Sequence, residues 1–536
     1  MTVAPALQQP FGVKERRSWG PVLAAALAFG ACGPTNTGSE SSPSTVPATS
    51  APRTAASAAA STAPPSASRV VLLEAPLPGE PTVTLYLPYL TKTLGGPAGW
   101  ETPFIIQNAD TFSTDLELSF YAISDGVLVA RRIVRGLQPG ASYADRPNHD
   151  PDLTDNAAYS GVVRSFGAKV VAVVNEQRGS GARFEADSYV GAFASLSTVF
   201  LPSVARRVDG FVSQIVVQNI GAQPTVASAA FLSTDGARTA TLTRTIQPGR
   251  SALIDLAAEA ALTDGVRYAA RITASERVVA IVNSHRDEPT DGAPMLYAYN
   301  ALLDGANTVF GPYAVKNVPG VGKGSSAVSV QNMARTAAQP SLTFTPLGGG
   351  SSTRFDGPTL AAGAPWSFDL RFRNGDPEQP ICGAQPSAGC LGDGEYSFVG
   401  GAPGEQFAAL VTVIGTTTAA AYAALTRPTA YFLPNVTRTL GGRDGWTTPI
   451  IVQSIDAGGL TLSWYRFSDG GLAVTQTLAA TPGAALRIDP RDVAGLNEDA
   501  QYAVLVAGNG GRLVAVVTEL NFSGGDGAAI YGGFSR

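Results

Sequence analysis

The stretch Leu87–Gly96 reads LPYLTKTLGG, and Leu433–Gly442 reads LPNVTRTLGG. The likeness continues without a gap, because Gly99-Trp100 follows the first stretch and Gly445-Trp446 follows the second at the same spacing. Self-similarity of this kind defines the structural unit before any single residue does. The unit has about 110 residues, which is the size of a domain and not of a solenoid turn.

Two more diverged copies lie between these two. In every copy an apolar segment ends in Gln-Asn or Gln-Ser, and the copy closes on a tyrosine within an apolar strand. The glutamines are Gln107, Gln218, Gln331 and Gln453, and the closing tyrosines are Tyr189, Tyr299, Tyr422 and Tyr531. We therefore expect four repeats, at residues 82–195, 196–304, 305–427 and 428–536.

Within a repeat, apolar residues alternate with polar ones, as in Leu116–Phe120, which places its apolar side chains on one face of a strand. Val170–Val174 is apolar throughout, which suits a strand covered on both sides. Asp125-Gly126 and its counterparts predict two-residue hairpin turns in which both residues have positive φ. With about seven or eight short strands per repeat, we expect an all-β chain of four tandem antiparallel β-sandwiches of immunoglobulin-like architecture, each with its own core. The Cys…Trp…Cys pattern of antibody domains is missing from the sequence.

Composition and charge exclude some classes of function. Charged residues make up 15% of the chain and the pI is about 5.3, with no stripe of Lys and Arg, so we do not expect a nucleic-acid partner. The sequence contains no HExxH, GxSxG, Walker or CxxC motif, and neither His149 nor His285 lies near a plausible Ser or Cys nucleophile. We therefore expect no enzyme activity and no cofactor. A carboxylate pair for glycoside hydrolysis, which is assembled in space, stays a minor alternative.

The N-terminal region predicts export. Basic residues precede the apolar stretch Trp19–Ala31, which is too short to span a bilayer and is typical of a secretory signal. Its ending, Gly30-Ala31-Cys32, resembles the lipobox of bacterial lipoproteins, although Phe29 stands where Leu is usual. We expect a signal peptide at residues 1–31, acylation of Cys32 and a place in the cell envelope. Ordinary cleavage nearby and an uncleaved anchor are the alternatives.

Residues 32–81 are dominated by Ser, Thr, Pro and Ala. Such a tract has too few large apolar side chains to offset the entropy of ordering it, so we expect a disordered linker after the lipidated cysteine.

Cys382 and Cys390 lie in an irregular insert of the third repeat, Ile381–Leu391. In an oxidising compartment we expect a disulfide between them, and free thiols are the alternative. Insertions on a rigid sandwich often carry recognition, so this insert is a candidate binding loop.

Two further features have a functional and a structural interpretation. Asp150, Asp152 and Asp155 cluster in a loop that is a weak candidate for Ca²⁺ binding, but the equivalent loops of other repeats are less acidic, which favours a solvated loop. Trp100 and Trp446 occupy matched positions, where they are candidates for an aromatic sugar platform or for buried anchors at strand ends.

One uncharged stretch has the composition of a membrane-spanning segment. Phe407–Leu425 has no charged residue and invites assignment as a membrane helix. Gly415 and the threonines around it, together with the counterparts of this stretch in other repeats, favour a β-hairpin instead.

Residues 82–536 resemble the tandem sandwich repeats of secreted and lipid-anchored bacterial surface proteins, in which a strand opening with Leu-Pro and a Gly-Trp-x-Thr segment recur at this spacing. The matching segment here is Gly445–Gln453. The resemblance implies a cell-surface protein with a structural, spacer or adhesive role, anchored to the membrane by an N-terminal lipid. The alternative is a lipoprotein that binds an extracellular glycan or protein through the insert of the third repeat.

Overall fold

The computed structural model describes residues 73–193, 195–286, 294–319, 323–426, 429–456 and 458–535. The predicted signal peptide, Cys32 and most of the predicted linker lie outside these ranges. Among the described residues the regular structure consists of β-strands and short 3-10 turns, so the all-β expectation is confirmed. Within the same ranges no helix has the length and apolar character that crossing a bilayer requires.

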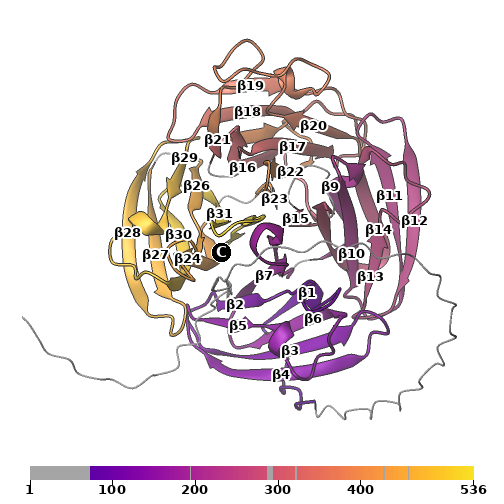
Figure 1. The fold of residues 1–536 in the computed structure, drawn as a ribbon, viewed down its shortest axis with the longest axis vertical. Helices are drawn as coiled ribbons and strands as arrows, with labels where there is room; N and C mark the ends of the chain where they lie inside the picture. Colours follow the sequence, from indigo (N-terminus) through magenta and orange to yellow (C-terminus); the bar gives the residue numbers. More distant parts are fainter. Residues whose placement is uncertain are drawn as a thin grey trace, which may run out of the picture.

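The four repeats are arranged as a closed ring (Figure 1). The first repeat, drawn in indigo and purple, is followed around the ring by the second in magenta, the third in salmon and orange, and the fourth in yellow, which returns to the first. We call the boundary between two neighbouring repeats a seam.

The first and second repeats share one order of strands. The first has β1 (Val83–Lys92), β2 (Phe104–Asn108), β3 (Thr114–Ala122), β4 (Leu128–Leu137), β5 (Ser142–Asp145), η1 (Pro147–His149), β6 (Ala157–Phe166), β7 (Val170–Arg178), η2 (Gly181–Arg183) and β8 (Glu185–Val190). The second has β9 (Leu196–Val208), β10 (Phe211–Asn219), β11 (Thr225–Ser233), β12 (Thr239–Ile246), β13 (Ser251–Asp255), β14 (Val266–Arg286) and β15 (Met295–Asn300). The long strand β14 takes the places of both β6 and β7.

The third and fourth repeats follow the same order. The third has β16 (Thr308–Lys316), β17 (Ser325–Asn332), β18 (Ser341–Pro346), β19 (Thr353–Asp356), β20 (Pro365–Asp369), η4 (Arg373–Gly375), β21 (Gly394–Gly401), β22 (Phe407–Ile414) and β23 (Ala419–Ala423). The fourth has β24 (Tyr431–Arg438), β25 (Trp446–Thr447), β26 (Ile450–Ser454), β27 (Gly458–Arg466), β28 (Leu472–Ala480), β29 (Ala485–Ile488), η5 (Pro490–Asp492), β30 (Ala500–Asn509), β31 (Leu513–Asn521), β32 (Ala528–Gly532) and β33 (Phe534–Ser535). The stretch tested as a membrane helix is the hairpin β22–β23, as expected.

Each repeat is a sandwich of two antiparallel sheets. In the first repeat the outer sheet has the order β1-β6-β3-β4 and the inner sheet β5-β2-β7-β8. The second repeat joins its two sheets into one through β14. In immunoglobulin domains the first two strands are neighbours in one sheet, whereas here β1 and β2 lie in different sheets. The chain therefore has the expected two-sheet architecture with a strand order of its own.

The closing tyrosine of each repeat fastens its two sheets together. The pairing of β1 with β6 skips from Leu87 to Leu90, so the first strand bulges around Pro88. The hydroxyl of Tyr189 on β8 donates to the carbonyl of Tyr89 and accepts the N–H of the same residue. Equivalent bonds join Tyr422 to Tyr313, Tyr531 to Asn435 and Tyr299 to Ser203. The repeated Leu-Pro and Tyr residues are thus explained, because a bulge leaves buried backbone groups that need a partner.

The repeated Gln-Asn pair holds loops in place. The side-chain amide of Asn108 donates to the carbonyls of Phe112 and Leu137, and its oxygen accepts the N–H of Asp110. Asn219 and Asn332 make the same three contacts in their repeats. These asparagines therefore tie the loop after the second strand to the end of the fourth strand.

The Asp-Gly turns differ from the expected type. Gly126 has a φ of 70°, but Asp125 is not among the residues with positive φ. The Asp125 carboxylate accepts the N–H of Val127, and the pairing of β3 with β4 shifts between Phe120 and Tyr121. The hairpin was predicted correctly, but its turn places one residue and not two in the left-handed region, as in a turn followed by a glycine bulge.

Replacing Tyr422 by Phe tests the tyrosine contact. The buried N–H and carbonyl of Tyr313 would lose their partner, so we expect the free energy of unfolding to fall by about 1–3 kcal/mol in urea denaturation. Tyr121→Phe is the matched control, because Tyr121 is a partly buried tyrosine of β3 outside this contact. Equal losses in the two variants would show that the bulge contact contributes nothing specific.

Candidate functional site

The ring closes because one packing contact is used four times. The first strand of each repeat packs against the inner sheet of the next repeat, so β1 contacts β10 and β14, β9 contacts β17 and β22, β16 contacts β26 and β31, and β24 contacts β2 and β7. Apolar cores cross these seams. Ile105 and Val173 of the first repeat belong to the core of the fourth, and Ile530 of the fourth belongs to the core of the third. Each repeat has a core of its own, as expected, but the four cores are not isolated from one another, since outward-facing apolar residues of each inner sheet pack on the core of the preceding repeat.

Four edge strands meet at the axis of the ring. These strands are β8, β15, β23 and β32, and each contacts the next around the axis. Within its own sheet each is paired on one side only. An edge strand in a dry environment has N–H groups without a strand to accept them, so other acceptors are required.

Two buried carboxylates supply these acceptors. Asp187 on β8 accepts the N–H of Ala298 from the second repeat and the N–H of Ile530 from the fourth. Asp526, in the turn before β32, accepts the N–H of Leu296 from the second repeat at 2.8 Å and the N–H of Ala419 from the third at 3.0 Å.

The backbone of Asp526 completes this arrangement. Its N–H donates to the carbonyl of Phe184, and its carbonyl accepts the N–H of Ala186, both in the first repeat. One residue of the fourth repeat thus binds all three other repeats. Burial raises the pKa of Asp187 and of Asp526 well above the usual value for a carboxyl, against the opposing effect of the amide donors.

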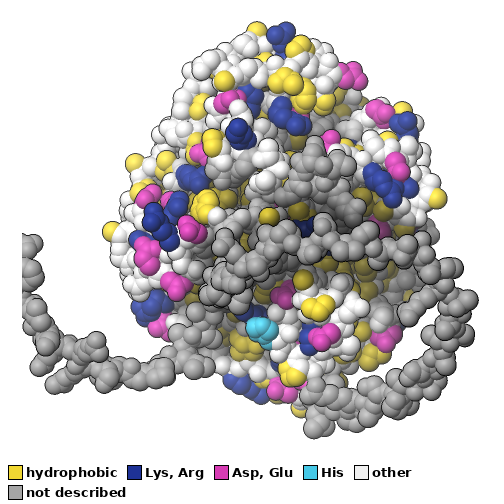
Figure 2. All heavy atoms as spheres, viewed as in Figure 1, with side chains coloured by type: hydrophobic (Ala, Val, Ile, Leu, Met, Phe, Trp, Pro, Cys, Tyr) yellow, Lys and Arg dark blue, Asp and Glu magenta, His cyan; other side chains and the backbone are white. Residues whose placement is uncertain are grey.

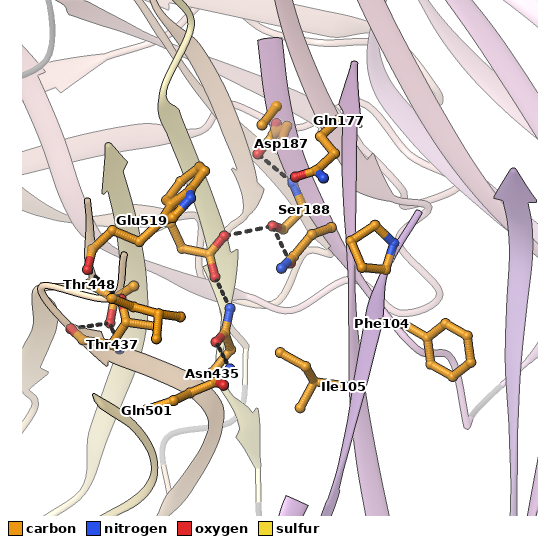
Figure 3. Close-up of a pocket in the computed structure, with 15 residues that line it drawn as sticks. Phe104, Ile105, Gln177, Asp187, Ser188, Asn435, Thr437, Thr448, Gln501 and Glu519 are labelled. Atoms are coloured by element: carbon orange, nitrogen blue, oxygen red, sulfur yellow. Dashed lines mark hydrogen bonds between the residues drawn. The ribbon is translucent and has the colours of Figure 1, made fainter. Parts of the chain in front are cut away.

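A second pair of carboxyls spans two seams. Glu519 on β31 accepts a hydrogen bond from the Ser188 hydroxyl of the first repeat at 2.9 Å and another from the Asn435 amide (Figure 3). Glu176, at the equivalent place on β7, accepts from the Asn283 amide of the second repeat at 2.9 Å. Burial raises the pKa of Glu176 to about 8 and that of Glu519 to about 7.

The cavity beside Glu519 is too small for an organic substrate. It has a volume of about 30 Å³ and is lined by side chains of the first and fourth repeats, among them Asp187, Ser188, Gln501 and Trp446. That space suits one or two water molecules. The carboxyl, hydroxyl and amide groups here can therefore bind one another and water, and their position indicates that they hold the seam.

The two predicted tryptophans lie at seams. Trp446 is buried, and its ring packs edge-on against Phe184 of the first repeat, with 6.1 Å between the ring centres. Trp100 is partly buried, lies edge-on to His285 of the second repeat, and is covered by the Arg178 guanidinium at 4.4 Å. The structure thus places both tryptophans as anchors between repeats.

The acidic side chains in this loop of the first repeat pair with basic side chains of strands β1 and β4. Arg132 forms ion pairs with Asp150 and Asp145, and the Lys92 ammonium lies 3.1 Å from Asp155. Asp152 is exposed. Across the described residues, no group of three or more His, Cys, Asp or Glu side chains is arranged to hold a metal ion.

The insert of the third repeat is a largely exposed loop closed by a disulfide. Cys382 and Cys390 form a disulfide and are both buried. The Lys316 ammonium donates to the carbonyl of Gly383 at 2.6 Å and to the Asp393 carboxylate at 2.8 Å. Ile381, beside the disulfide, is 76% exposed.

The sequence interpretation missed the acids that close the ring and the cations that hold the loops. Each first strand has a basic residue at the same position, namely Lys92, Arg206, Lys316 and Arg438. Each of these donates to a backbone carbonyl of the loop that precedes β6 or its equivalent, β14, β21 or β30. A signal for the acids was present, because Glu176 and Glu519 each end a run of apolar strand residues. An acid in such a run requires either solvent or a buried partner.

Neither the family models nor the curated proteins compared with this chain match it.

Replacing Asp526 by Asn tests the contact at the axis. The amide has one accepting oxygen, so the N–H of either Leu296 or Ala419 would face another donor and stay unsatisfied. We expect the free energy of unfolding to fall by about 1–3 kcal/mol and the two backbone amides to exchange hydrogen faster. Asp456→Asn is the control, because Asp456 pairs with Arg512 at the surface, where an ion pair contributes little. Unchanged exchange at both amides would contradict the assignment.

The two seam glutamates predict how stability depends on pH. Their folded pKa values, about 8 and about 7, lie above the unfolded value, so the folded ring binds more protons between about pH 4.5 and pH 8. The free energy of unfolding therefore falls as pH rises through this window.

The double variant Glu176→Gln with Glu519→Gln removes both titrating carboxyls. Each new amide oxygen still accepts from Asn283 or Asn435, and the new NH2 at position 519 can donate to the Ser188 hydroxyl, which keeps Asn175 as its acceptor. We expect the melting temperature to fall less steeply between pH 5 and pH 8 than in the unsubstituted chain. Glu498→Gln is the control and should leave that slope unchanged, because Thr439 and Arg438 hold the pKa of Glu498 below its usual value. A double variant with the original slope would refute the role given to these acids.

Proposed function

We propose that this chain is a non-enzymatic lipoprotein of the cell envelope, held by an acylated Cys32, whose ring of repeats serves as an adhesive platform. Closure of the ring is the observation that carries the proposal. A spacer gains reach when repeats stack end to end, whereas here β24 of the fourth repeat packs back on the first. A closed ring gains no reach from its repeats, but it holds many loops in fixed positions, which suits surface contacts.

The surface of the ring supports contact with other molecules. Large apolar side chains are exposed on loops of three repeats, namely Phe112 at 68%, Phe193 at 53%, Ile381 at 76% and Phe522 at 49%. Figure 2 shows basic and acidic side chains interspersed over the visible face. Such a surface favours partners of low net charge over strongly charged polymers.

The alternative is a binding lipoprotein that uses the insert of the third repeat. The exposure of Ile381 on a loop closed by a disulfide and held by Lys316 favours this alternative. If replacing Ile381 by Ser abolishes binding of an extracellular glycan or protein while the ring stays folded, this alternative is favoured.

Replacing Cys32 by Ala tests the anchor. Without the thiol no lipid can be attached, so we expect the variant to leave the membrane fraction or to accumulate as precursor, and not to incorporate labelled palmitate. The double variant Cys382→Ala with Cys390→Ala keeps Cys32 and should fractionate like the unsubstituted protein. Palmitate labelling of the Cys32→Ala variant at the original level would refute the anchor.

A further inference from the structure

A large groove lies at the seam between the fourth and first repeats. Its volume is about 980 Å³, within the usual range for ligand sites. The fourth repeat contributes Phe432, Tyr465 and Leu505, and the first contributes residues that include Thr84 and Lys169. Phe193, on the segment that leads to the second repeat, also lines it.

An equivalent groove lies at the opposite seam, between the second and third repeats. Its volume is about 750 Å³, and it is lined by Phe200 and Arg271 of the second repeat and by Asn332 and Met333 of the third. Phe200 and Phe432 both precede the Leu-Pro pair of a first strand, so the two grooves are built from matching positions.

A depression at the axis connects the two grooves. It has a volume of about 220 Å³ and shares Phe193 and Ser535 with the first groove and Leu303 with the second. The three hollows therefore lie next to one another across the ring, from one seam through the axis to the opposite seam, and we call this series of hollows the trough.

An alternation in the sequence marks the seams at which the grooves lie. The residue after the tyrosine of the sixth strand position is Ser160 in the first repeat, Ala269 in the second, Ser397 in the third and Ala503 in the fourth. The Ser160 hydroxyl bonds to that of Ser251 across the first seam, and Ser397 donates to the carbonyl of Gly483 across the third. At the two seams where these grooves lie, the equivalent residues are Ala269 and Ala503, whose methyl groups offer no such bond.

The lining of the trough is uncharged for the most part. Hydroxyl and amide side chains line both grooves, including Thr82, Thr84, Gln107, Thr198, Thr273 and Gln406, and each groove has a Phe ring. The first groove has one acid and one base, Asp110 and Lys169, and the second has one acid and two bases, Asp304, Arg271 and Arg335, so the two grooves together have a small excess of positive charge. Aromatic rings beside hydroxyl and amide groups match a ligand with apolar C–H faces and many hydroxyls.

A peptide strand fits the trough less well. Extended peptides bind by adding to a free strand edge, but the edges of the first strands are already used. Tyr86 pairs with Ala192, Phe200 with Leu302 and Phe432 with Phe534, so the closing segment of each of these repeats covers the edge.

We propose that the trough binds one chain of a linear, uncharged polysaccharide, laid across the ring from the seam of the fourth and first repeats to the seam of the second and third. The inference rests on the proposed adhesive function and gives it a ligand class and a site. A long chain engages both grooves, so its second contact is intramolecular and its affinity exceeds that of a short fragment.

Isothermal titration of the full chain with neutral oligosaccharides tests the site. The probes are trimers, hexamers and soluble polymers of β-1,4-glucan, β-1,3-glucan, α-glucan, mannan and chitin, with alginate as a charged comparison and a mixture of extended peptides as the protein comparison. We expect at least one neutral polymer to bind at least 100-fold more tightly than its trimer, and alginate and peptides to bind more weakly than that polymer.

Variants then locate the binding. Phe193→Ala, combined with Tyr465→Ala, should weaken binding of that polymer at least tenfold, while Phe522→Ala, which removes a similarly exposed ring outside the trough, should leave it unchanged. Circular dichroism and the melting temperature verify that each variant keeps the ring.

Failure to bind any neutral polymer, tighter binding of peptides, or equal affinity in the Phe193 and Phe522 variants would overturn the proposal. Adhesion of cells to the immobilised full chain is measured in parallel. If cells still adhere in any of these cases, the adhesive function is supported and only the assignment of the trough as its binding site is wrong. Loss of adhesion and of glycan binding together would remove both.

Discussion

The ring depends on satisfying the backbone of four edge strands at a dry axis. A sandwich in water leaves its edges to solvent, but β8, β15, β23 and β32 face one another, and each is paired on one side only. Asp187 and Asp526 accept N–H groups from the other repeats and so replace the missing neighbour strands. The cost of burying the two acids appears as their raised pKa values. Apolar packing of each inner sheet on the neighbouring repeat then adds buried area at the seams.

The sandwich of each repeat was predictable because its rules are local. The apolar run Val170–Val174 identified a strand with two covered faces, and the structure buries it accordingly. Alternation identified Leu116–Phe120 as a strand with its apolar residues in the core, but Glu117 and Ser119 on the other face are buried as well, with Glu117 paired to Arg164. The disulfide of the third repeat also followed from short spacing in the chain. The turn at Asp125-Gly126 was placed correctly, but its type was not, because one dipeptide is compatible with both a two-residue turn and a turn with a glycine bulge.

The ring and its site were not predictable from the sequence. A strand face that packs inside its own sandwich and a strand face that packs on a neighbouring repeat are both apolar, so the sequence does not distinguish them. Ile105 and Ile106 are both apolar and buried, yet Ile106 belongs to the core of its own repeat and Ile105 to that of the fourth. Trp446 likewise reads as an anchor without revealing what it is anchored to. Glu176 and Glu519, charged residues near the end of apolar strands, are a sequence signal that distinguishes a seam from a core.

The four repeats also differ in alternation, so that the first and third seams resemble each other and the second and fourth seams resemble each other. Four identical seams would be either all closed or all open, and a ring of that kind has no preferred direction on its face. The order Tyr-Ser, Tyr-Ala, Tyr-Ser, Tyr-Ala places serine hydrogen bonds across the first and third seams, whereas the two grooves lie at the second and fourth. Opposite grooves joined through the axis define one direction across the ring. A single hydroxyl, present or absent at one position of each repeat, thus distinguishes the two seams that have these grooves from the other two.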